Sequence, residues 1–409
     1  MIEQIRAEYQ ADYVVAAMSG DFVQRGEPAI FDKYERARDA LTHGVDLVVQ
    51  IPVMFSTSSA EDFAAGGVAV LRSLGFVDQL VFGSESADLA KLQQMAALEL
   101  STGSTAHAKF NAVVRDGVAS GMSYPKARAE AMKLVLSGDD EEAFETMLEN
   151  TSSFELQSND VLGLEYIKAV KRQGDCFEVA CIRRKLSLPS AHSIRDALLQ
   201  GDIHADGHAG YATLDMLSDM LSYRLLQLVY LDSAAPEEHS VLCDYLDVSR
   251  EIADALRKQV RERMSFRERI AVVKSRNYTY SRISRALLHI LLDIQRKDHA
   301  ALRGAYFGEA EMMPYVRVLG VRKEAKELLA AIATTAVTSP ARYQRSLDAL
   351  RQQTIESPED LLASIRAGHA ELMSRCDLYA ADLYRLIYHP YSRDVHLENE
   401  FTRKFMVID

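Results

Sequence analysis

The chain has 409 residues, which is too long for one compact core and suits two or three domains. Hydrophobic residues make up 48% and charged residues 26%, with only 9 prolines, so a disordered or collagen-like chain is excluded. The formal net charge of −12 excludes a general polyanion binder, because phosphates would repel most of the surface. No apolar run is long enough to cross a bilayer, and we expect no membrane partner.

The cysteine spacing predicts neither a zinc ribbon nor a disulfide framework, since no two cysteines are separated by two residues. The amino-terminal residues are too polar for a signal peptide. We therefore expect a reducing, cytoplasmic setting. The cysteines are Cys176, Cys181, Cys243 and Cys376.

Strand-like and helix-like segments alternate over the first two hundred residues. Val- and Ile-rich runs predict strands that are covered on both faces, and helical spacing fills the intervals. The alternation predicts an α/β fold with a parallel, Rossmann-like sheet. Strands are expected at residues 12–18, 45–51, 79–82 and 177–182, and helices at 33–42, 60–74, 87–100 and 161–170.

The strand signal fades after Arg195. A loop with three glycines at residues 200–211 predicts a domain boundary, so we divide the chain into residues 1–200 and 201–409. The second part is expected to be mainly α-helical. Its helical spacing covers residues 214–231, 248–264, 280–294, 322–334 and 358–386.

Residues suited to phosphate follow each predicted strand. Gly20 allows close backbone approach, Ser56–Ser59 carry hydroxyls, and Arg183–Lys185 are cations, while Gly83 follows the third strand. Because ligands of open parallel sheets bind beyond the carboxyl ends of the strands, we expect these residues to form one nucleotide-binding edge.

Two further segments can be interpreted in two ways. Ser193 and Arg195 precede a short helical run and can contact a phosphate, or can be an N-cap and a solvated side chain. The neighbouring Arg183–Lys185 cluster favours the phosphate role. Asn159 precedes an apolar helix and is either part of its cap or a ligand contact.

One spacing resembles a metal site. Asp202, His204, Asp206 and His208 alternate in a glycine-rich loop without a hydrophobic shell, so we predict no metal site there.

The chain carries one strongly basic segment. Residues 251–285 hold ten Lys and Arg against four acids, and Tyr278 and Tyr280 lie among the cations of 274–285. If nucleic acid binds, we expect it there. The cations of 257–269 lie at helical spacing and can alternatively form a solvated face paired with Glu262 and Glu268.

Motifs along nearly the whole chain resemble the bacterial tRNA(Met) cytidine acetate ligases of the nucleotidyltransferase superfamily. The most specific is the loop from Met18 to Ala29, MSGDFVQRGEPA, which we call the signature loop. Further matches are Phe82–Glu85, Asn159–Tyr166, Arg184, Ser193–Arg195, Lys274–Arg285, Tyr315–Gly320 and Glu400–Arg403.

The resemblance implies an ATP-dependent ligase with elongator tRNA(Met), ATP and acetate as substrates. Acetate attacks the α-phosphate, and the acetyl-adenylate then acetylates the N4 amine of the wobble cytidine. Residues 1–200 become a nucleotidyltransferase-like ATP-binding catalytic domain, and residues 201–409 a tRNA-binding domain. No protein nucleophile is needed, so no catalytic residue is assigned.

The same resemblance implies binding residues. ATP, accompanied by Mg2+, is expected to contact Gly83, Asn159, Arg184 and Lys185. The residue pattern after the strands adds Gly20, Ser193 and Arg195 as possible phosphate contacts. The basic segment supplies the expected tRNA contacts Lys274, Arg276, Arg282 and Arg285.

The sequence departs from this family at its start. The family carries a His-x-Gly-His motif that holds the ATP phosphates, whereas no His precedes His43 here and the motif does not occur. We expect a truncated gene model that binds ATP weakly, which an in-frame motif in the upstream DNA would establish. Gln50 also stands where the family usually has an acid.

Two other functions are left open. One is a nucleotidyltransferase that acts on a small molecule, against which the large basic helical part argues. The other is a non-catalytic tRNA-binding protein.

Overall fold

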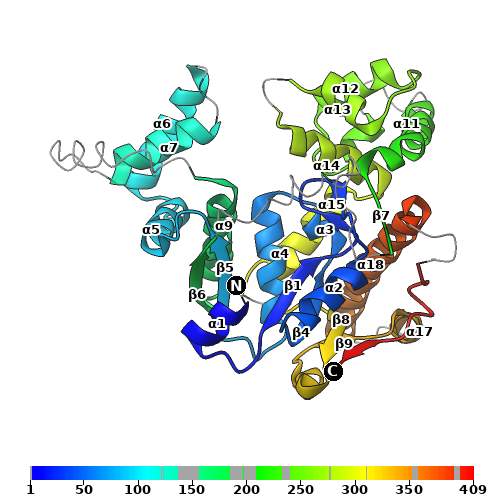
Figure 1. Cartoon of the computed structure of the whole chain (residues 1–409). Coiled ribbons are helices and arrows are strands. Elements are labelled where there is room, and N and C mark those ends of the chain that lie inside the picture. The colour runs from blue at the N-terminus through cyan, green and yellow to red at the C-terminus, as the bar shows by residue number, and fades with distance from the viewer. Residues whose placement is uncertain are drawn as a thin grey trace. The chain divides into compact units, whose positions relative to one another are not determined.

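The computed structural model divides into two compact units, which we describe separately (Figure 1). Unit 1 comprises residues 1–76 and 189–409, and unit 2 comprises residues 77–188. The structure describes residues 2–120, 122, 124–136, 156–184, 197, 209–232, 240–275, 278–309, 311–351, 358–390 and 397–409.

The sheet of unit 1 combines strands from both ends of the chain. β1 (Val15–Ser19) pairs in parallel with β4 (Leu47–Ile51), and β4 pairs antiparallel with β8 (Tyr315–Arg322). β8 in turn pairs in parallel with β9 (Thr335–Val337) and with β11 (Met406–Ile408). The predicted strands β1 and β4 are confirmed, and the central position of β4 explains why all five of its residues are buried.

The strand signal fades after Arg195 in the sequence, but three strands of the sheet lie beyond it. β8 is a central strand with seven of its eight residues buried, in a segment where no strand was predicted. The helix expected over residues 322–334 is found only in part, as two short helices, η4 (Lys323–Ala325) and α16 (Leu328–Ala331). Val316, Val318 and Val321 fit a pleated, buried surface, but the partner that selects the strand lies far away in the sequence.

The helix α2 (Lys33–Thr42) has the predicted bounds because its cap is unambiguous. The Asp32 carboxylate accepts hydrogen bonds from the backbone N–H groups of Tyr34 and Glu35. The apolar face of α2 packs on the sheet around Val48 and Leu319. α4 (Ala60–Arg72) contacts β1 and β4 and is capped by Ser59, so the sheet carries packed helices as an α/β fold requires.

Helices make up most of the remainder of unit 1. The other elements are α1 (Ile2–Tyr9), β2 (Phe22–Val23), β3 (Glu27–Pro28), α3 (Val53–Ser56), β7 (Gly210–Tyr211), η2 (Leu214–Leu217), α11 (Ser218–Asp232), η3 (Val241–Asp244), α12 (Arg250–Gln259), α13 (Phe266–Val273), α14 (Tyr280–Leu291), α15 (Arg296–Tyr306), α17 (Pro340–Arg351), α18 (Pro358–Ile387) and β10 (His389–Pro390).

Unit 2 is built on the parallel pair of β5 (Gln79–Ser84) and β6 (Glu178–Arg183). α9 (Ser158–Arg172) lies close to β5 because Gly163 has no side chain there; a Cβ would come within 2.3 Å of the Phe82 ring. The other helices of the unit are α5 (Leu89–Leu100), α6 (Thr105–Ala119) and α7 (Tyr124–Leu136).

The four predicted strands do not share one hydrogen-bonded sheet in the described part of the chain. β1 and β4 belong to the sheet of unit 1, whereas β5 and β6 form a separate pair in unit 2. The alternation of strands and helices predicts parallel pairing correctly but does not specify which strands are neighbours.

Two chain-wide features bear on the expectations from composition. Within the described residues, no helix combines the length and apolar character needed to span a membrane. All four cysteines are free thiols.

Candidate functional site

Gly83 lies near the end of β5 in unit 2. Its neighbours Phe82 and Ser84 are buried, and Gly83 is on the opposite, less buried side of the strand. A Cβ built at Gly83 would meet no atom within 4 Å. The predicted ATP contact therefore borders open space on the strand.

Glu85 follows β5 and binds the first turn of α9. Its carboxylate accepts hydrogen bonds from the backbone N–H groups of Asn159 and Asp160, both at 3.1 Å. It also accepts one from the Asn159 side-chain amide, with Nδ2 at 2.8 Å from Oε1. Asn159 is not the N-cap, because the helix begins at Ser158. Two N–H groups of the first helical turn, which have no acceptor within the helix, are thus satisfied by a carboxylate of the protein itself.

Asp160 makes the reverse connection from α9 to the loop after β5. Its carboxylate accepts hydrogen bonds from the Ser84 hydroxyl and from the backbone N–H groups of Glu85 and Ser86, the last two at 3.1 and 3.3 Å. Loop and helix therefore hold each other, which fixes the position of Asn159.

The cations after β6 differ in their surroundings. Arg183 donates to the backbone carbonyls of Glu85 and Ser86, the latter at 2.9 Å, so it stabilises the loop. Arg184 lies with Nη1 3.9 Å from Glu85 Oε1, and its side chain is 39% exposed. The guanidinium of Arg184 is therefore accessible to a ligand.

Glu85 is the residue of this site that the sequence analysis did not single out. It contacts two predicted ATP contacts, Asn159 and Arg184, and lies on the loop that directly follows β5, the strand that contains Gly83. The sequence feature that could have identified Glu85 is its position in the same Phe82–Glu85 motif as Gly83. The structure brings three of the predicted ATP contacts to this loop and the elements bound to it, while Lys185, Ser193 and Arg195 lie outside the described residues.

The signature loop of unit 1 forms a small hairpin of β2 and β3 that packs on α14. Gly26 has φ +79°, which favours glycine, and a Cβ there would come within 2.4 Å of the Arg285 backbone nitrogen. The Ser284 hydroxyl donates to the Gly26 carbonyl at 2.8 Å. The glycine is thus required by a close approach between the loop and the basic segment.

Gly20 lies at the start of the signature loop beside Gln50. A Cβ at Gly20 would be 3.0 Å from Gln50 Nε2, and Arg36 donates to the carbonyls of Ser19 and Gly20. Gln50 is buried, and its Oε1 has no hydrogen-bond partner among the described residues. These contacts give Gly20 a packing role, and its phosphate contact remains a prediction.

The hydroxyl run after β4 does not face a ligand. Ser56 donates to the Phe22 carbonyl, Thr57 to the Val53 carbonyl and Ser58 to the Met54 carbonyl, and all three residues are buried. Ser59 caps α4. The prediction that this run contributes to a phosphate-binding edge is wrong, because its hydroxyls satisfy backbone groups.

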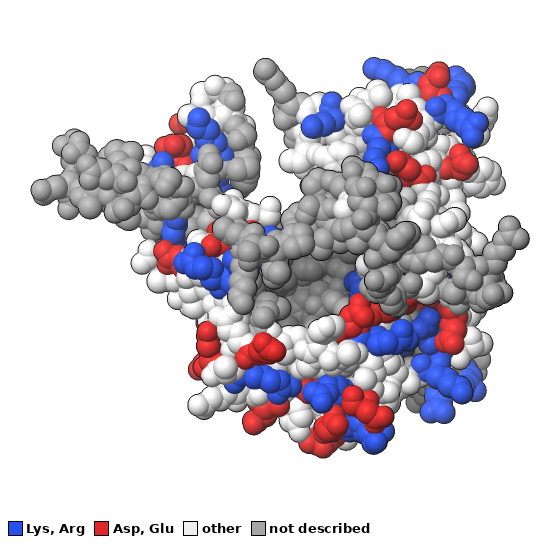
Figure 2. Space-filling view, in the orientation of Figure 1, with Lys and Arg blue, Asp and Glu red and all other residues white. Residues whose placement is uncertain are grey.

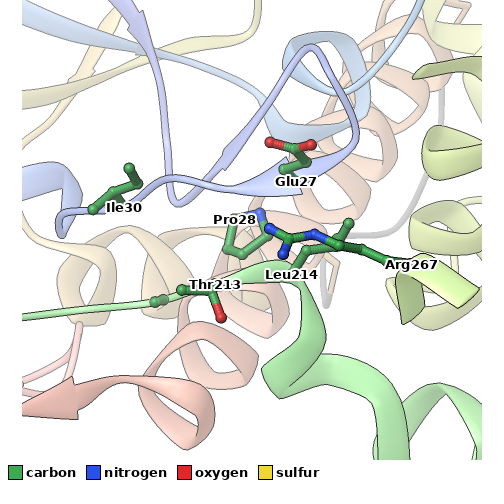
Figure 3. Close-up of a pocket in the computed structure, with 7 residues that line it drawn as sticks. Glu27, Pro28, Ile30, Thr213, Leu214 and Arg267 are labelled. Carbon is green, nitrogen blue, oxygen red and sulfur yellow. The ribbon is translucent and has the colours of Figure 1, made fainter. Parts of the chain in front are cut away.

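A small pocket borders the signature loop in unit 1 (Figure 3). Its walls come from the hairpin end, from the segment before α11 and from α13, whose Arg267 side chain reaches toward Pro28. The Arg267 guanidinium is 3.5 Å from Asp215, so its charge is partly balanced there. The lining residues are Glu27, Pro28, Ile30, Ala212, Thr213, Leu214 and Arg267.

The predicted tRNA contacts lie in different environments. Lys274 is exposed, and Arg282 lies over the Tyr278 ring with its guanidinium carbon 4.8 Å from the ring centre. Arg285 is 9% exposed and paired with Asp247 at 3.0 Å. Arg276 lies outside the described residues.

The cations of residues 257–269 do not all form a solvated face. Arg269 is fully buried and donates to the carbonyls of Gln259 and Glu262, so it stabilises the connection between α12 and α13. Figure 2 shows other Lys and Arg side chains on the surface over these helices.

The candidate metal ligands between Asp202 and His208 lie outside the described residues. Among the residues that the structure describes, no three His, Cys, Asp or Glu side chains are grouped to hold a metal ion.

Comparison with known proteins gives consistent matches over the whole chain. The family model described as HIGH Nucleotidyl Transferase matches residues 1–398. A tRNA(Met) cytidine acetate ligase of Caldanaerobacter subterraneus subsp. tengcongensis is 32% identical, with 93% of this chain and 89% of the relative covered. The protein of the same name from Thermoanaerobacter sp. (strain X514) is 30% identical with the same coverage. The crystal structure of Thermotoga maritima TmcAL bound with alpha-thio ATP matches with a TM-score of 0.78 and 25% identity, covering 100% of this chain and 95% of that one.

Proposed function

This chain belongs to the HIGH nucleotidyltransferase family, and from that premise we propose that it is a tRNA(Met) cytidine acetate ligase. The observation that carries the proposal is the arrangement of Gly83, Asn159 and Arg184 around Glu85. These residues come from three separate segments of unit 2, and the similar Thermotoga maritima structure was solved with an ATP analogue.

The reaction is a two-step acyl transfer. An acetate oxygen attacks the α-phosphorus of ATP, the bond to the β-phosphate bridging oxygen breaks, and acetyl-adenylate and pyrophosphate form. The N4 amine of the wobble cytidine of elongator tRNA(Met) then attacks the acetyl carbonyl. AMP leaves and the amine loses a proton, giving N4-acetylcytidine.

The chain contributes binding and charge stabilisation to this reaction. In our proposal the adenosine lies against the backbone at Gly83, where no side chain intervenes, and contacts Asn159. Arg184, with Lys185, offsets the charge that develops on the phosphates. Gly20, Ser193 and Arg195 are proposed as further phosphate contacts. Orientation of two bound substrates supplies the rest, since no covalent enzyme intermediate is needed.

Mg2+ enters our proposal with the triphosphate. The described residues group no three carboxylate, imidazole or thiol side chains that could hold a cation by themselves. Phosphate oxygens are the usual ligands of Mg2+ in ATP-dependent enzymes, so they would hold the ion and it would neutralise phosphate charge.

The tRNA is proposed to bind residues 201–409 at the basic segment. Lys274, Arg276 and Arg282 are the proposed phosphate contacts, and the Tyr278 ring under Arg282 can stack on an unpaired base. The buried ion pair of Arg285 with Asp247 positions α14, so the contribution of Arg285 to binding is through that helix. Since tRNA and ATP are cytoplasmic, we place the reaction in the cytoplasm.

The test is transfer of radiolabelled acetate to unmodified tRNA(Met) by the purified protein. ATP-dependent transfer to the wobble cytidine is the expected result. Binding of tRNA without ATP consumption would replace the proposal with a non-catalytic tRNA-binding protein. Pyrophosphate exchange that ignores tRNA would favour an enzyme acting on a small molecule.

A further inference from the structure

Glu85 determines which way the Asn159 amide faces. An ionised carboxylate only accepts hydrogen bonds, and Asn159 Nδ2 lies 2.8 Å from Glu85 Oε1. The amide nitrogen therefore faces Glu85. The amide oxygen is turned away and has no hydrogen-bond partner within the described part of the chain.

The Glu85 carboxylate is itself held in place. Its side chain is 10% exposed, and Oε2 receives the backbone N–H groups of Asn159 and Asp160 at 3.1 Å each. The Glu85 backbone N–H in turn donates to Asp160 Oδ1. These hydrogen bonds therefore fix the orientation of the Glu85 carboxylate relative to the Asn159 side chain.

An outward amide oxygen suits one purine better than the other. Adenine carries an amino group at C6 that donates a hydrogen bond, whereas guanine carries an oxygen there that accepts one. We propose that Glu85 makes the nucleotide site selective for adenine, by holding the Asn159 amide so that its oxygen accepts a hydrogen bond from the adenine amino group. This inference rests on the proposed function, which places ATP against Asn159.

Glu85→Gln tests the proposal because it should reverse the amide. The two backbone N–H groups at Oε2 require an acceptor, so the oxygen of the introduced glutamine takes that position and its NH2 group faces Asn159. Asn159 then has to turn its oxygen inward and its nitrogen outward. Arg184, 3.9 Å away and 39% exposed, can move into solvent.

The measurement is the ratio of the dissociation constants for GTP and ATP, by titration calorimetry. Wild type should favour ATP, and Glu85→Gln should shift the ratio toward GTP by at least about tenfold. Glu178→Gln, an exposed glutamate on β6, is the matched control and should leave the ratio unchanged. An unchanged ratio in folded Glu85→Gln, or an equal loss of both nucleotides, would overturn the proposal, since a purely structural role predicts one of these.

A second measurement needs no variant. Purine riboside triphosphate lacks the amino group, and inosine triphosphate has an oxygen in its place. Wild-type protein should bind the first more weakly than ATP and the second more weakly still. Equal affinity for all three would overturn the proposal. Acetate transfer with ATP but no purine discrimination would refute only this inference, whereas no ATP consumption at all would refute the proposed function.

Discussion

Lys33→Met tests how the signature loop is held in unit 1. Lys33 is 2% exposed, and its Nζ lies 2.9 Å from Asp21 in the signature loop and 3.0 Å from Glu400 near the carboxyl end. Methionine fills a similar volume without the charge. Glu400 would keep its ion pair with Arg317 at 3.2 Å. Asp21 has no second ion pair among the described residues, so its charge would be left buried.

The expected loss follows from leaving a buried carboxylate unpaired. Removing one partner of a buried ion pair costs about 3–5 kcal/mol, so the free energy of unfolding should fall by that amount at neutral pH. Lys323→Met is the matched control. Its ion pair with Asp409 has nearly the same length, 2.9 Å, but the side chains are 63% and 88% exposed, which limits the expected cost to about 0–1 kcal/mol.

The effect of Lys33→Met on stability should also depend on pH, because Lys33 contacts the Glu400 carboxylate. Burial alone would raise the pKa of Glu400, but Lys33 and Arg317 lower it to about 2. The stabilisation by this ionised carboxylate is present above its ordinary pKa of 4.5 and is lost as pH falls toward 2. Urea denaturation of both variants at pH 7 and pH 3 measures the effect. The difference between wild type and Lys33→Met should shrink at pH 3. Equal losses in the two variants at pH 7 would refute the reasoning.

Three further predictions follow from the same contacts. The double variant Lys274→Ala, Arg282→Ala should bind tRNA more weakly. The slope of log binding constant against log salt concentration should become smaller by about 0.7–0.9 per lost phosphate contact. Lys326→Ala, at an exposed lysine, is the control, and equal slopes for the two proteins would contradict the proposed surface. Burial raises the pKa of Asp377 to about 7, so the free energy of unfolding should fall as pH rises from 4 to 7. Asp377→Asn should remove this pH dependence and stabilise the protein by about 2–4 kcal/mol at pH 8, measured by urea denaturation. If the variant keeps the pH dependence, Asp377 is not the group responsible. Arg184→Ala should slow ATP–pyrophosphate exchange by about a hundredfold while tRNA binding is unchanged; wild-type exchange would remove it from the site.

Local signals were sufficient where one segment determines its own structure. The bounds of α2 could be predicted because Asp32 caps it, and β4 could be predicted because its residues are continuously apolar. β8 could not, since Arg317 and Gly320 interrupt its apolar character and its partner β4 is more than 250 residues away. The buried Arg317 pairs there with Glu400 of the carboxyl-terminal tail and also donates to the Val337 carbonyl and the Tyr34 hydroxyl, all of them distant in sequence or on another element.

The sequence predicted the proposed ligand contacts of the candidate site but not the residue that holds them in place. Gly83 and Asn159 could be singled out from the motifs that contain them. The role of Glu85 depends on a hydrogen bond to a helix 74 residues later in the chain, which no spacing reveals. The opposite error occurred at Ser56–Ser58, because a hydroxyl that donates to a backbone carbonyl inside the protein has the same sequence pattern as one that faces a ligand.

The basic segment shows why a count of cations overstates an RNA-binding surface. Arg269 and Arg285 are buried in internal contacts, and Arg267 lies 3.5 Å from Asp215. The excess of six positive charges in the sequence therefore includes side chains that stabilise the fold. The salt slope of tRNA binding should be correspondingly smaller than the ten cations suggest. Stacking on aromatic rings such as Tyr278, which does not depend on salt, then has to supply part of the affinity.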